Sequence, residues 1–444
     1  MSSGGSLYHS SGSPLAPVAE ALAWLWRLGP PCDAPEAAAV GIGESHEAPE
    51  LQALVRARRL SGAVILAAGS ADEAAPLPFR RVRVGVARIG SVHVEGAHTL
   101  FAGGRAVVRS SLGVHAVRSG DLLAIGADPS VWGRLDLFWV LEAIASFLVE
   151  RLGRPLVLLP PVGCLRLDDF PGTAELQLRG AAKRDSRQRR QAETMIAQLE
   201  RAQARLVVAA PACALAGNAE APLDRVWPDA VAELARGVDR GVLEPACHGL
   251  LHLEPGAREE GRVDPREFAH LDASAAGDRI DAACAWLRHH LGDPRSFVAP
   301  AWAYGPGALA AATERALPSW LPPEPAPLLS GLTLHETLAI GLPGLHGVDY
   351  TPLQRLAAIG LPPTVVFHGR LLDDRLPRLR SDRDLPTALR LAWKRDLERL
   401  IGLTGLRWVG ASELLEQLRA HDAVEAEDGK IDAETVASAR LFYG

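Results

Sequence analysis

The stretch Cys164-Leu-Arg-Leu-Asp-Asp-Phe170 decides how this chain is interpreted. An apolar strand running up to Leu167 would carry Asp168 and Asp169 to the point where the strand ends. Two adjacent carboxylates are unfavourable there, because like charges held close together raise each other's pKa. A bound cation removes that penalty, and one aspartate can then bind the cation while its neighbour moves a proton. Taken alone, the pair also fits an ordinary strand-to-loop turn, where Asp is common.

A second polar motif, His248-Gly-Leu-Leu-His252, follows the segment Val242-Leu-Glu-Pro-Ala-Cys247. The i, i+4 spacing places both imidazoles on one side if the segment turns helically. Two surface histidines on a loop are the simpler interpretation of this spacing. Each motif follows its own apolar strand, however, and histidine and aspartate together are common metal ligands. The two motifs therefore predict a hydrolytic metal site.

Aromatic residues follow the next predicted strand, in the segment 298–305, which contains Pro300, Trp302 and Tyr304. A Pro/Gly turn with aromatic packing explains this segment without any function. The functional alternative is a wall of the site, in which Trp302 stacks on a sugar face and the Tyr304 hydroxyl binds polar groups. We count these three residues as candidate substrate-binding residues.

Two further residues are candidates because of their positions on predicted strands. Arg166 either pairs with one aspartate or faces solvent, and we add it to the candidate substrate-binding residues. His368 ends the apolar segment Thr364-Val-Val-Phe and is a candidate general acid. A lone histidine is more often a satisfied core or rim group than a catalyst.

Composition limits the class of protein. The chain has 444 residues, 48% of them hydrophobic and 23% charged, which is typical of a soluble globular protein with two domains or one elaborated barrel. A net charge of −6 argues against nucleic acid as a partner. Five cysteines without CxxC spacing, no recognisable export signal and no long uncharged apolar stretch lead us to expect a cytoplasmic protein without a membrane partner.

The order of predicted elements divides the chain into four parts. We expect a disordered Ser/Gly-rich N-terminus (1–14), a smaller α/β accessory domain (15–153), a barrel (154–420) and a C-terminal tail (421–444). In the third part strands alternate with helices, which predicts a parallel (β/α) barrel with its site at the C-terminal rim of the strands. The predicted helices are 16–27, 49–59, 131–152, 186–204, 229–240, 265–290 and 385–403.

The chain resembles the polysaccharide deacetylase superfamily over about residues 155–418, in its RxDD and HGxxH motifs. The similarity is to a carbohydrate-esterase-family-4-like, uncharacterised bacterial branch. It implies a distorted (β/α) barrel of the NodB-homology type and one divalent metal ion, usually Zn²⁺. It further implies that Asp168 is the catalytic base, that Asp169, His248 and His252 bind the metal, and that His368 is the general acid.

The chain departs from this family's pattern at two places. Gly249 stands where the family often has Ser or Thr after the first histidine. The arginine of the usual RxPY-type third motif is missing, so an arginine that tethers the base is absent or comes from elsewhere. The first domain faintly resembles amidotransferase-like or flavodoxin-like α/β domains in the segment 120–128. It lacks a GxCxG nucleophile motif, and we expect it to be non-catalytic.

These observations predict a metal-dependent hydrolase of carbon–nitrogen bonds other than peptide bonds. We expect an N-deacetylase acting on an N-acetylated sugar or small glycoconjugate, with Asp168 as base towards a metal-activated water. The alternatives are a related barrel hydrolase that acts on a cyclic amide or another linkage, and a non-catalytic carbohydrate-binding or sensing protein.

Overall fold

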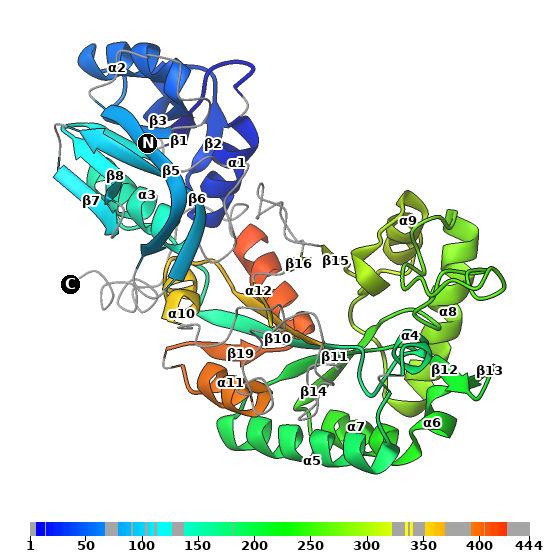
Figure 1. Cartoon of the computed structure of the whole chain (residues 1–444). Helices are drawn as coiled ribbons and strands as arrows, with labels where there is room; N and C mark the ends of the chain where they lie inside the picture. The colour runs from blue at the N-terminus through cyan, green and yellow to red at the C-terminus, as the bar shows by residue number, and fades with distance from the viewer. Residues whose placement is uncertain are drawn as a thin grey trace.

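The structure is a computed structural model, and its strands form two main sheets (Figure 1). One sheet comes from the N-terminal part of the chain and the other from the part after residue 160. The structure describes residues 6–13, 15–66, 79–89, 92–102, 105–110, 113–126, 137–180, 182–321, 334–335, 338–340, 351–368, 392–403 and 405–423. The predicted disorder of residues 1–14 is wrong for Ser6–Tyr8, which form a buried strand paired with two others, and the residues before Ser6 lie outside the described part. Of the predicted tail 421–444, residues 421–423 belong to a helix and the rest lies outside the described part.

The N-terminal sheet has seven strands in the order β2-β1-β3-β4-β9-β8-β7. The first five are parallel, and β8 and β7 continue the sheet antiparallel. Their bounds are β1 (Ser6–Tyr8), β2 (Gly29–Cys32), β3 (Ala38–Glu44), β4 (Gly62–Leu66), β7 (Arg105–Ser110), β8 (Gly113–Ser119) and β9 (Leu122–Ile125). The helices of this part are α1 (Ala16–Leu25), α2 (Ala48–Arg56) and α3 (Leu137–Leu152), and β5 (Phe79–Ile89) and β6 (Val92–Ala102) form a separate hairpin.

The prediction of an α/β unit before the barrel is confirmed. Its parallel strands follow the order 2-1-3-4-5 that is also found in flavodoxin-like sheets. However, β2 and β3 are joined by the short 3₁₀ turn η1 (Pro35–Ala37) rather than by an α-helix. The amidotransferase-like or flavodoxin-like character of this unit therefore stays a prediction.

The second sheet is parallel and curled, and it forms half of a barrel. Its order is β14-β11-β10-β18-β17, and β19 pairs with the first residues of β10. The strands are β10 (Val162–Asp168), β11 (Leu206–Ala210), β14 (Leu243–Cys247), β17 (Leu338–Ile340), β18 (Thr364–His368) and β19 (Arg407–Val409). Isolated parallel bridges extend the pairing from Cys247 to Phe297 and on to Ser319. The predicted distorted barrel is thus confirmed in part, as a curled half-barrel.

Helices pack along this sheet as the alternation of elements predicts. They are α5 (Asp185–Ala202), α7 (Pro228–Asp239), α8 (Ala273–His290), α9 (Pro306–Glu314), α10 (Thr351–Ala358), α11 (Ala392–Ile401) and α12 (Ala411–Ala423). In Figure 1, α5 and α7 run side by side below the sheet, and α8 and α9 stand together at one end. Strand residues Leu165 and Leu167 pack into the core that lies between the sheet and the helices α5 and α7. The alternate residues of the strand, which include Arg166 and Asp168, consequently point to the inner side of the curl.

Several predicted boundaries are wrong. The apolar segment 156–160 is strand-like in sequence but forms no strand, since prolines at 155, 160 and 161 lack the N–H that a ladder needs. Helix α8 begins at Ala273 rather than at Pro265, because Asp272 caps it by accepting the N–H of Ala275 at 2.8 Å. The segment from Ser296 contributes only the bridge at Phe297. The hairpin of β12 (Cys213–Ala216) and β13 (Ala219–Pro222), the short helix α4 (Ala174–Leu178) and the helices α9, α10 and α12 were not predicted.

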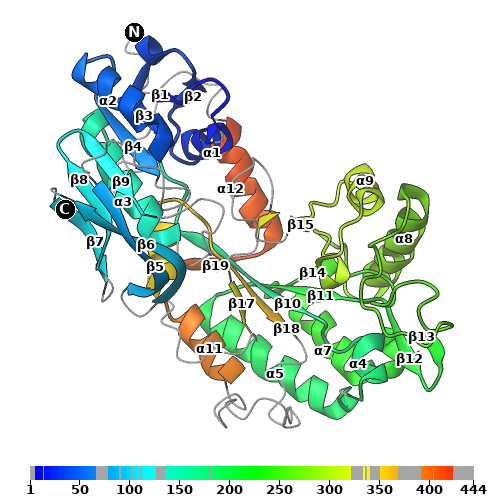
Figure 2. The ribbon, with the colours of Figure 1, turned by 45° about the horizontal axis from the view of Figure 1, so that its top comes forward.

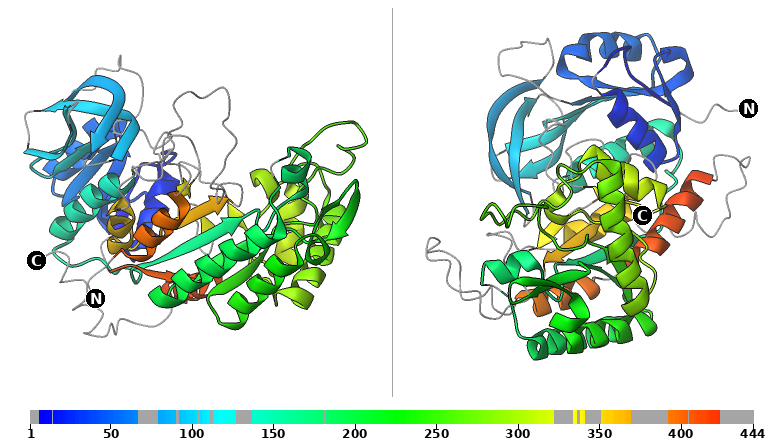
Figure 3. Two further views of the ribbon diagram at one scale, coloured as in Figure 1. Left: turned by 60° about the horizontal axis from the view of Figure 1, so that its bottom comes forward. Right: turned by 90° about the vertical axis from the view of Figure 1, so that its right-hand side faces the viewer.

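The two parts of the chain are in contact through α12, whose C-terminal end lies beside α1 (Figures 2 and 3). The His421 Nε2 lies 2.9 Å from the carbonyl oxygen of Trp24, and the Arg27 Nε donates to the His421 Nδ1 at 3.1 Å. The Trp26 indole also donates to the carbonyl of Ile359 at 2.9 Å. One hydrophobic core, which includes residues of both parts, lies behind these contacts.

Among the described residues, we find no helix with both the length and the apolar character that crossing a bilayer requires.

Candidate metal centre

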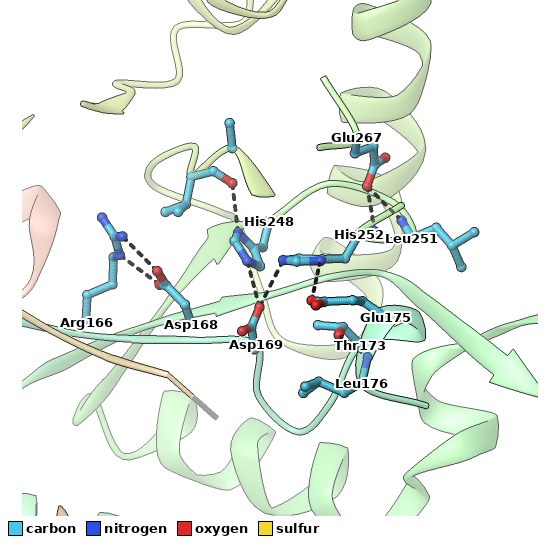
Figure 4. Close-up of polar contacts among 12 residues, drawn as sticks. Arg166, Asp168, Asp169, Thr173, Glu175, Leu176, His248, Leu251, His252 and Glu267 are labelled. Atoms are coloured by element: carbon cyan, nitrogen blue, oxygen red, sulfur yellow. Dashed lines mark hydrogen bonds and ion pairs between the residues drawn. The ribbon is translucent and has the colours of Figure 1, made fainter. Parts of the chain in front are cut away.

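The two aspartates at the end of β10 have different backbone conformations. Asp168 is the last residue of the extended strand, whereas Asp169 has φ of 62°, in the left-handed region. The chain therefore turns sharply between them, and both side chains are buried while facing different partners (Figure 4). This turn gives two adjacent carboxylates two separate environments.

Asp168 is held by Arg166 from the same strand. The Arg166 Nε donates to one carboxylate oxygen at 2.8 Å and its Nη2 donates to the other at 2.7 Å. Residues i and i+2 of a strand share a face, so this bidentate pair follows from the strand itself. The guanidinium of Arg166 also lies 5.1 Å from the ring centre of Trp320, within the range of a cation–π contact.

Arg166 is thus placed differently from a substrate-binding residue. Its side chain is 0% exposed, and it is not among the residues that line the pocket described below. Of the two alternatives that the sequence left open for Arg166, the pairing with an aspartate is confirmed and the solvent-facing position is wrong. The third-motif arginine that the sequence lacks has a substitute here. Arg166, two residues before Asp168, holds the Asp168 carboxylate in its place.

Asp169, His248 and His252 come together as a compact group of ligand atoms. Their nearest donor atoms all lie within 4.8 Å of one another, and all three residues are buried. The Asp169 Oδ1 lies 3.2 Å from the Nε2 of His248 and 3.0 Å from the Nε2 of His252. Ligands of a tetrahedral Zn²⁺ with bonds of about 2.0–2.1 Å are separated by about 3.3 Å. Two imidazoles and one carboxylate at these distances fit a zinc-type ion with a coordination position left open.

The His248 ring is held by the segment that follows the bridge at Phe297. Its Nδ1 lies 2.8 Å from the carbonyl oxygen of Val298, which can only accept a hydrogen bond. The Nδ1 therefore carries a proton, which leaves Nε2, the ring nitrogen that faces Asp169, as the one that can give a lone pair to a cation. Such an outer hydrogen bond is how proteins fix the tautomer of a metal-binding histidine.

Burial and mutual charge set the pKa values of this group. Burial raises the pKa of Asp169, but the imidazoles of His252 and His248 outweigh it and hold the pKa well below the usual range. Burial lowers the pKa of His252, whereas Asp169 raises it, with a net pKa above the ordinary value. Asp169 is consequently ionised in the folded protein, which is the state in which a carboxylate binds a cation.

The loop that carries both histidines is shaped around the buried side chain of Glu267. Its carboxylate accepts the backbone N–H groups of Leu250 at 2.9 Å, of Leu251 at 3.1 Å and of His252 at 2.7 Å. Gly249 has φ of 77°, and a Cβ there would lie 2.7 Å from the Glu267 Oε2. A side chain at position 249 would therefore displace Glu267. The departure from Ser or Thr at this position has a steric reason.

A pocket of about 110 Å³ opens over the three candidate ligands, which is room for several waters or a small substrate group. Its lining combines the three ligands with both predicted catalytic residues and one predicted aromatic residue: Asp168, Asp169, Glu175, His248, His252, Pro265, Val298, Ala299, Ala301, Trp302 and His368. Asp168 and His368 are direct neighbours in the register of β10 and β18. The sheet thus brings the proposed base and the proposed acid to the same edge.

The aromatic segment contributes one of its three candidates to the pocket. Trp302 is 39% exposed, and its ring lies 5.5 Å from that of His368. Pro300 is buried in the short 3₁₀ turn η4 (Pro300–Trp302) and does not line the pocket. The Tyr304 hydroxyl accepts the N–H of Ala299 at 3.1 Å and donates to the carbonyl of Trp320. Tyr304 therefore stabilises the segment from within.

Sequence analysis missed Glu175 and Glu267. Glu175 lies on α4, a short helix with Thr173 as its N-cap. This helix is too short to show a hydrophobic periodicity in the sequence. A Thr shortly before a carboxylate is a weak helix-start signal that could have pointed to it. Glu267 lies in an irregular segment, and we find no pattern in the sequence that would have singled it out.

Comparisons with known proteins give similarity in structure only. No family model matches this sequence. A search of curated proteins also gave no match. The chain is similar to the Xyl-CE4 domain of a multidomain xylanase from the hindgut metagenome of Trinervitermes trinervoides, with 14% identity over 58% of this chain and 91% of that one, at a TM-score of 0.32.

Two further similarities fall in the same group. A family 4 carbohydrate esterase from Streptomyces lividans in complex with acetate has 11% identity over 56% of this chain and 92% of its own, at a TM-score of 0.32. A CE4 family pseudoenzyme from Bacillus anthracis has 10% identity over 58% of this chain and 66% of its own, also at 0.32. These structures are of the carbohydrate esterase family 4 that the motifs resemble. At such low TM-scores, the function proposed next rests on the residues of the site alone.

Proposed function

We propose that this protein is a metal-dependent hydrolase of carbon–nitrogen bonds that removes the acetyl group from an N-acetylated sugar or small glycoconjugate. One observation supports it most: a buried Asp169–His248–His252 cluster shares a single pocket with Asp168 and His368. Ligands, base and acid are the three kinds of group that amide hydrolysis at neutral pH requires.

Asp169, His248 and His252 would hold the metal, and a Zn²⁺ ion fits their donor set. When bound, such an ion lowers the pKa of a water molecule and polarises a carbonyl group. The contribution of the protein is to keep both Nε2 atoms and one carboxylate oxygen facing one point, with little freedom to rotate.

Asp168 would accept the proton of the attacking water. A carboxylate offers about four lone-pair sites, and Arg166 occupies two of them, so Asp168 keeps acceptor capacity towards the pocket. Arg166 acts here as a positioning residue: its bidentate contact fixes the plane of the carboxylate. We assign no substrate contact to Arg166.

His368 would protonate the departing amine. It lies across the ladder from Asp168, so acid and base flank the same opening. Trp302 stands beside His368 with a partly exposed ring, which suits stacking on the apolar face of a sugar. Among the predicted substrate-binding residues, we keep only Trp302 in this role.

The test is to measure metal content and acetate release on the same purified protein. We expect about one Zn²⁺ or similar ion per chain, loss of turnover after chelation, recovery on adding metal back, and activity on some members of a panel of N-acetylated sugars. Protein without stoichiometric metal, and indifferent to chelators, would overturn the proposal.

The panel also separates the alternatives. Metal-loaded protein that binds sugars without turnover would favour a sensing or binding protein. Hydrolysis of cyclic amides in place of N-acetyl sugars would favour a related barrel hydrolase.

A further inference from the structure

The two histidines of the proposed metal centre have different outer partners. The His248 Nδ1 lies at hydrogen-bond distance from a neutral backbone carbonyl. The His252 Nδ1 is buried and has no hydrogen-bond partner within the described part of the chain. Its nearest acidic oxygen is the Glu175 Oε2, at 3.7 Å. Figure 4 shows the His252 ring lying between Asp169 on one side and Glu175 on the other.

Metal binding at Nε2 would make the His252 Nδ1 a hydrogen-bond donor. A histidine that gives the lone pair of Nε2 to a metal must carry its proton on Nδ1. A buried N–H without an acceptor costs about 1–3 kcal/mol. The Glu175 oxygen needs a shift of about 0.8 Å to reach the usual N–H···O distance of about 2.9 Å.

We propose that Glu175 is a positioning residue of the metal centre, which accepts the Nδ1–H of His252 and so fixes the tautomer that binds metal. The inference rests on the proposed metal site. It assigns to Glu175 a role that neither sequence motif announced. The centre then has one histidine held by a carbonyl and one held by a carboxylate.

The surroundings of Glu175 aim its carboxylate at His252. Glu175 is 9% exposed and lines the pocket from the first turn of α4. The Thr173 hydroxyl caps that turn by accepting the N–H of Leu176 at 3.2 Å. Arg179 pairs with the other oxygen, Oε1, at 2.7 Å, which leaves Oε2 for the histidine.

A purely structural role explains this arrangement less well. Arg179 is 54% exposed, and an exposed i, i+4 pair contributes only about 0.3–0.5 kcal/mol. Such a pair does not require a buried carboxylate, because both groups could meet at the surface. The burial of Glu175 against a ligand histidine has a reason only if His252 uses it.

Metal affinity of two variants tests the proposal. We expect Glu175→Ala to bind Zn²⁺ about 10–100-fold more weakly than the wild-type protein in competition with a chromophoric chelator. Glu175→Gln should fall between the two, because its amide oxygen still accepts a hydrogen bond but carries no charge. Glu193→Gln is the matched control: this surface glutamate pairs with Arg189 on α5, and its loss should leave affinity unchanged. Wild-type affinity in both Glu175 variants would overturn the inference.

A second measurement uses the unaltered protein and so does not depend on any variant folding. With Zn²⁺ added to protein carrying ¹⁵N-labelled histidine, long-range proton–nitrogen NMR should show His252 as the Nδ1–H tautomer. Its proton should resonate further downfield than that of His248, since hydrogen bonds to charged acceptors are shorter and stronger. Equal shifts, or a His252 proton that exchanges freely with solvent, would reject the role of Glu175 while leaving the metal site intact. Absence of metal binding by the wild-type protein would instead reject the proposed function itself.

Discussion

In both main sheets a buried carboxylate lies at the C-terminal edge of the parallel strands, but the partners of these two carboxylates differ. At the edge of β1 and β3, Glu47 is 8% exposed and accepts the Ser10 hydroxyl, the Ser13 hydroxyl at 3.1 Å and the N–H of Glu44 at 2.7 Å. At the edge of β10, Asp169 is 6% exposed and faces two imidazole nitrogens and a pocket. Depth of burial does not distinguish them.

What distinguishes them is the kind of partner. The hydroxyl and amide donors around Glu47 are fixed by the chain and complete its hydrogen bonding, as expected of a structural carboxylate. The Nε2 atoms around Asp169 can give lone pairs to a cation, and they converge on one point together with the carboxylate. A buried carboxylate whose partners are all hydrogen-bond donors of the chain stabilises the fold. A buried carboxylate whose oxygen lies close to other potential metal-ligand atoms indicates a metal site.

The largest expected effect concerns the base. Asp168→Asn should lower kcat on the best N-acetylated substrate by about 10²–10⁴-fold, because the amide cannot accept the proton of water. Metal content should stay at the wild-type level, since Asp168 is not a ligand. His248→Ala should lose metal and turnover together, and Asp293→Asn, on an exposed side chain, should change neither. Retained turnover in Asp168→Asn would show that another group is the base.

Next in size is the buried pair beneath the site. Arg166→Met should lower the free energy of unfolding by about 3–5 kcal/mol, because it leaves the Asp168 carboxylate buried without its counter-charge. The double variant Arg166→Met/Asp168→Asn should regain part of that loss, which urea unfolding would measure. Arg288→Met is a control in an exposed pair with Asp293, where we expect a loss below about 1 kcal/mol. A single-variant loss as small as the control would show that Arg166 does not compensate Asp168.

The smallest effect probes the other sheet. Glu47→Gln replaces an acceptor oxygen with an NH₂ group facing donors, and should lower the free energy of unfolding by about 1–3 kcal/mol. Its metal content and kcat should equal those of the wild-type protein. A change in metal affinity would contradict the distinction drawn between the two carboxylates. Denaturant unfolding and metal analysis on the same sample decide it.

The candidate site was predictable wherever a residue ends a strand. Asp168 and His368 could be placed because parallel strands deliver their last residues to one edge, and the HxxxH spacing indicated the histidines. The Arg166–Asp168 pair was also within reach, since the period of two along a strand puts both on one face. Its full burial was not, because that depends on Trp320, a residue far along the chain.

The remaining parts depend on irregular backbone. Trp302 reaches the pocket through two successive residues with positive φ, Ala301 at 54° and Trp302 at 55°, a conformation that L-residues rarely adopt. Glu267 organises the histidine loop from an irregular segment fifteen residues away. Neither has a local sequence signal. The fold was predicted in part: α1, α2, α3, α5, α7, α8 and α11 correspond to predicted helices, whereas α4, α9, α10, α12 and the β12–β13 hairpin do not.

The register of β10 against β18 also bears on how such a protein can change its substrate. Asp168 and His368 are spaced by backbone hydrogen bonds between neighbouring strands, which lie about 4.7–4.9 Å apart in any sheet. Trp302 and Pro265, by contrast, reach the same pocket from segments outside the strands. Substitutions, insertions or grafts in those segments can reshape the opening while the ladder keeps the spacing of the proposed acid and base. The proposed chemistry and its selectivity would then depend on separate parts of the chain, so the loops are where new specificities should be sought by mutagenesis.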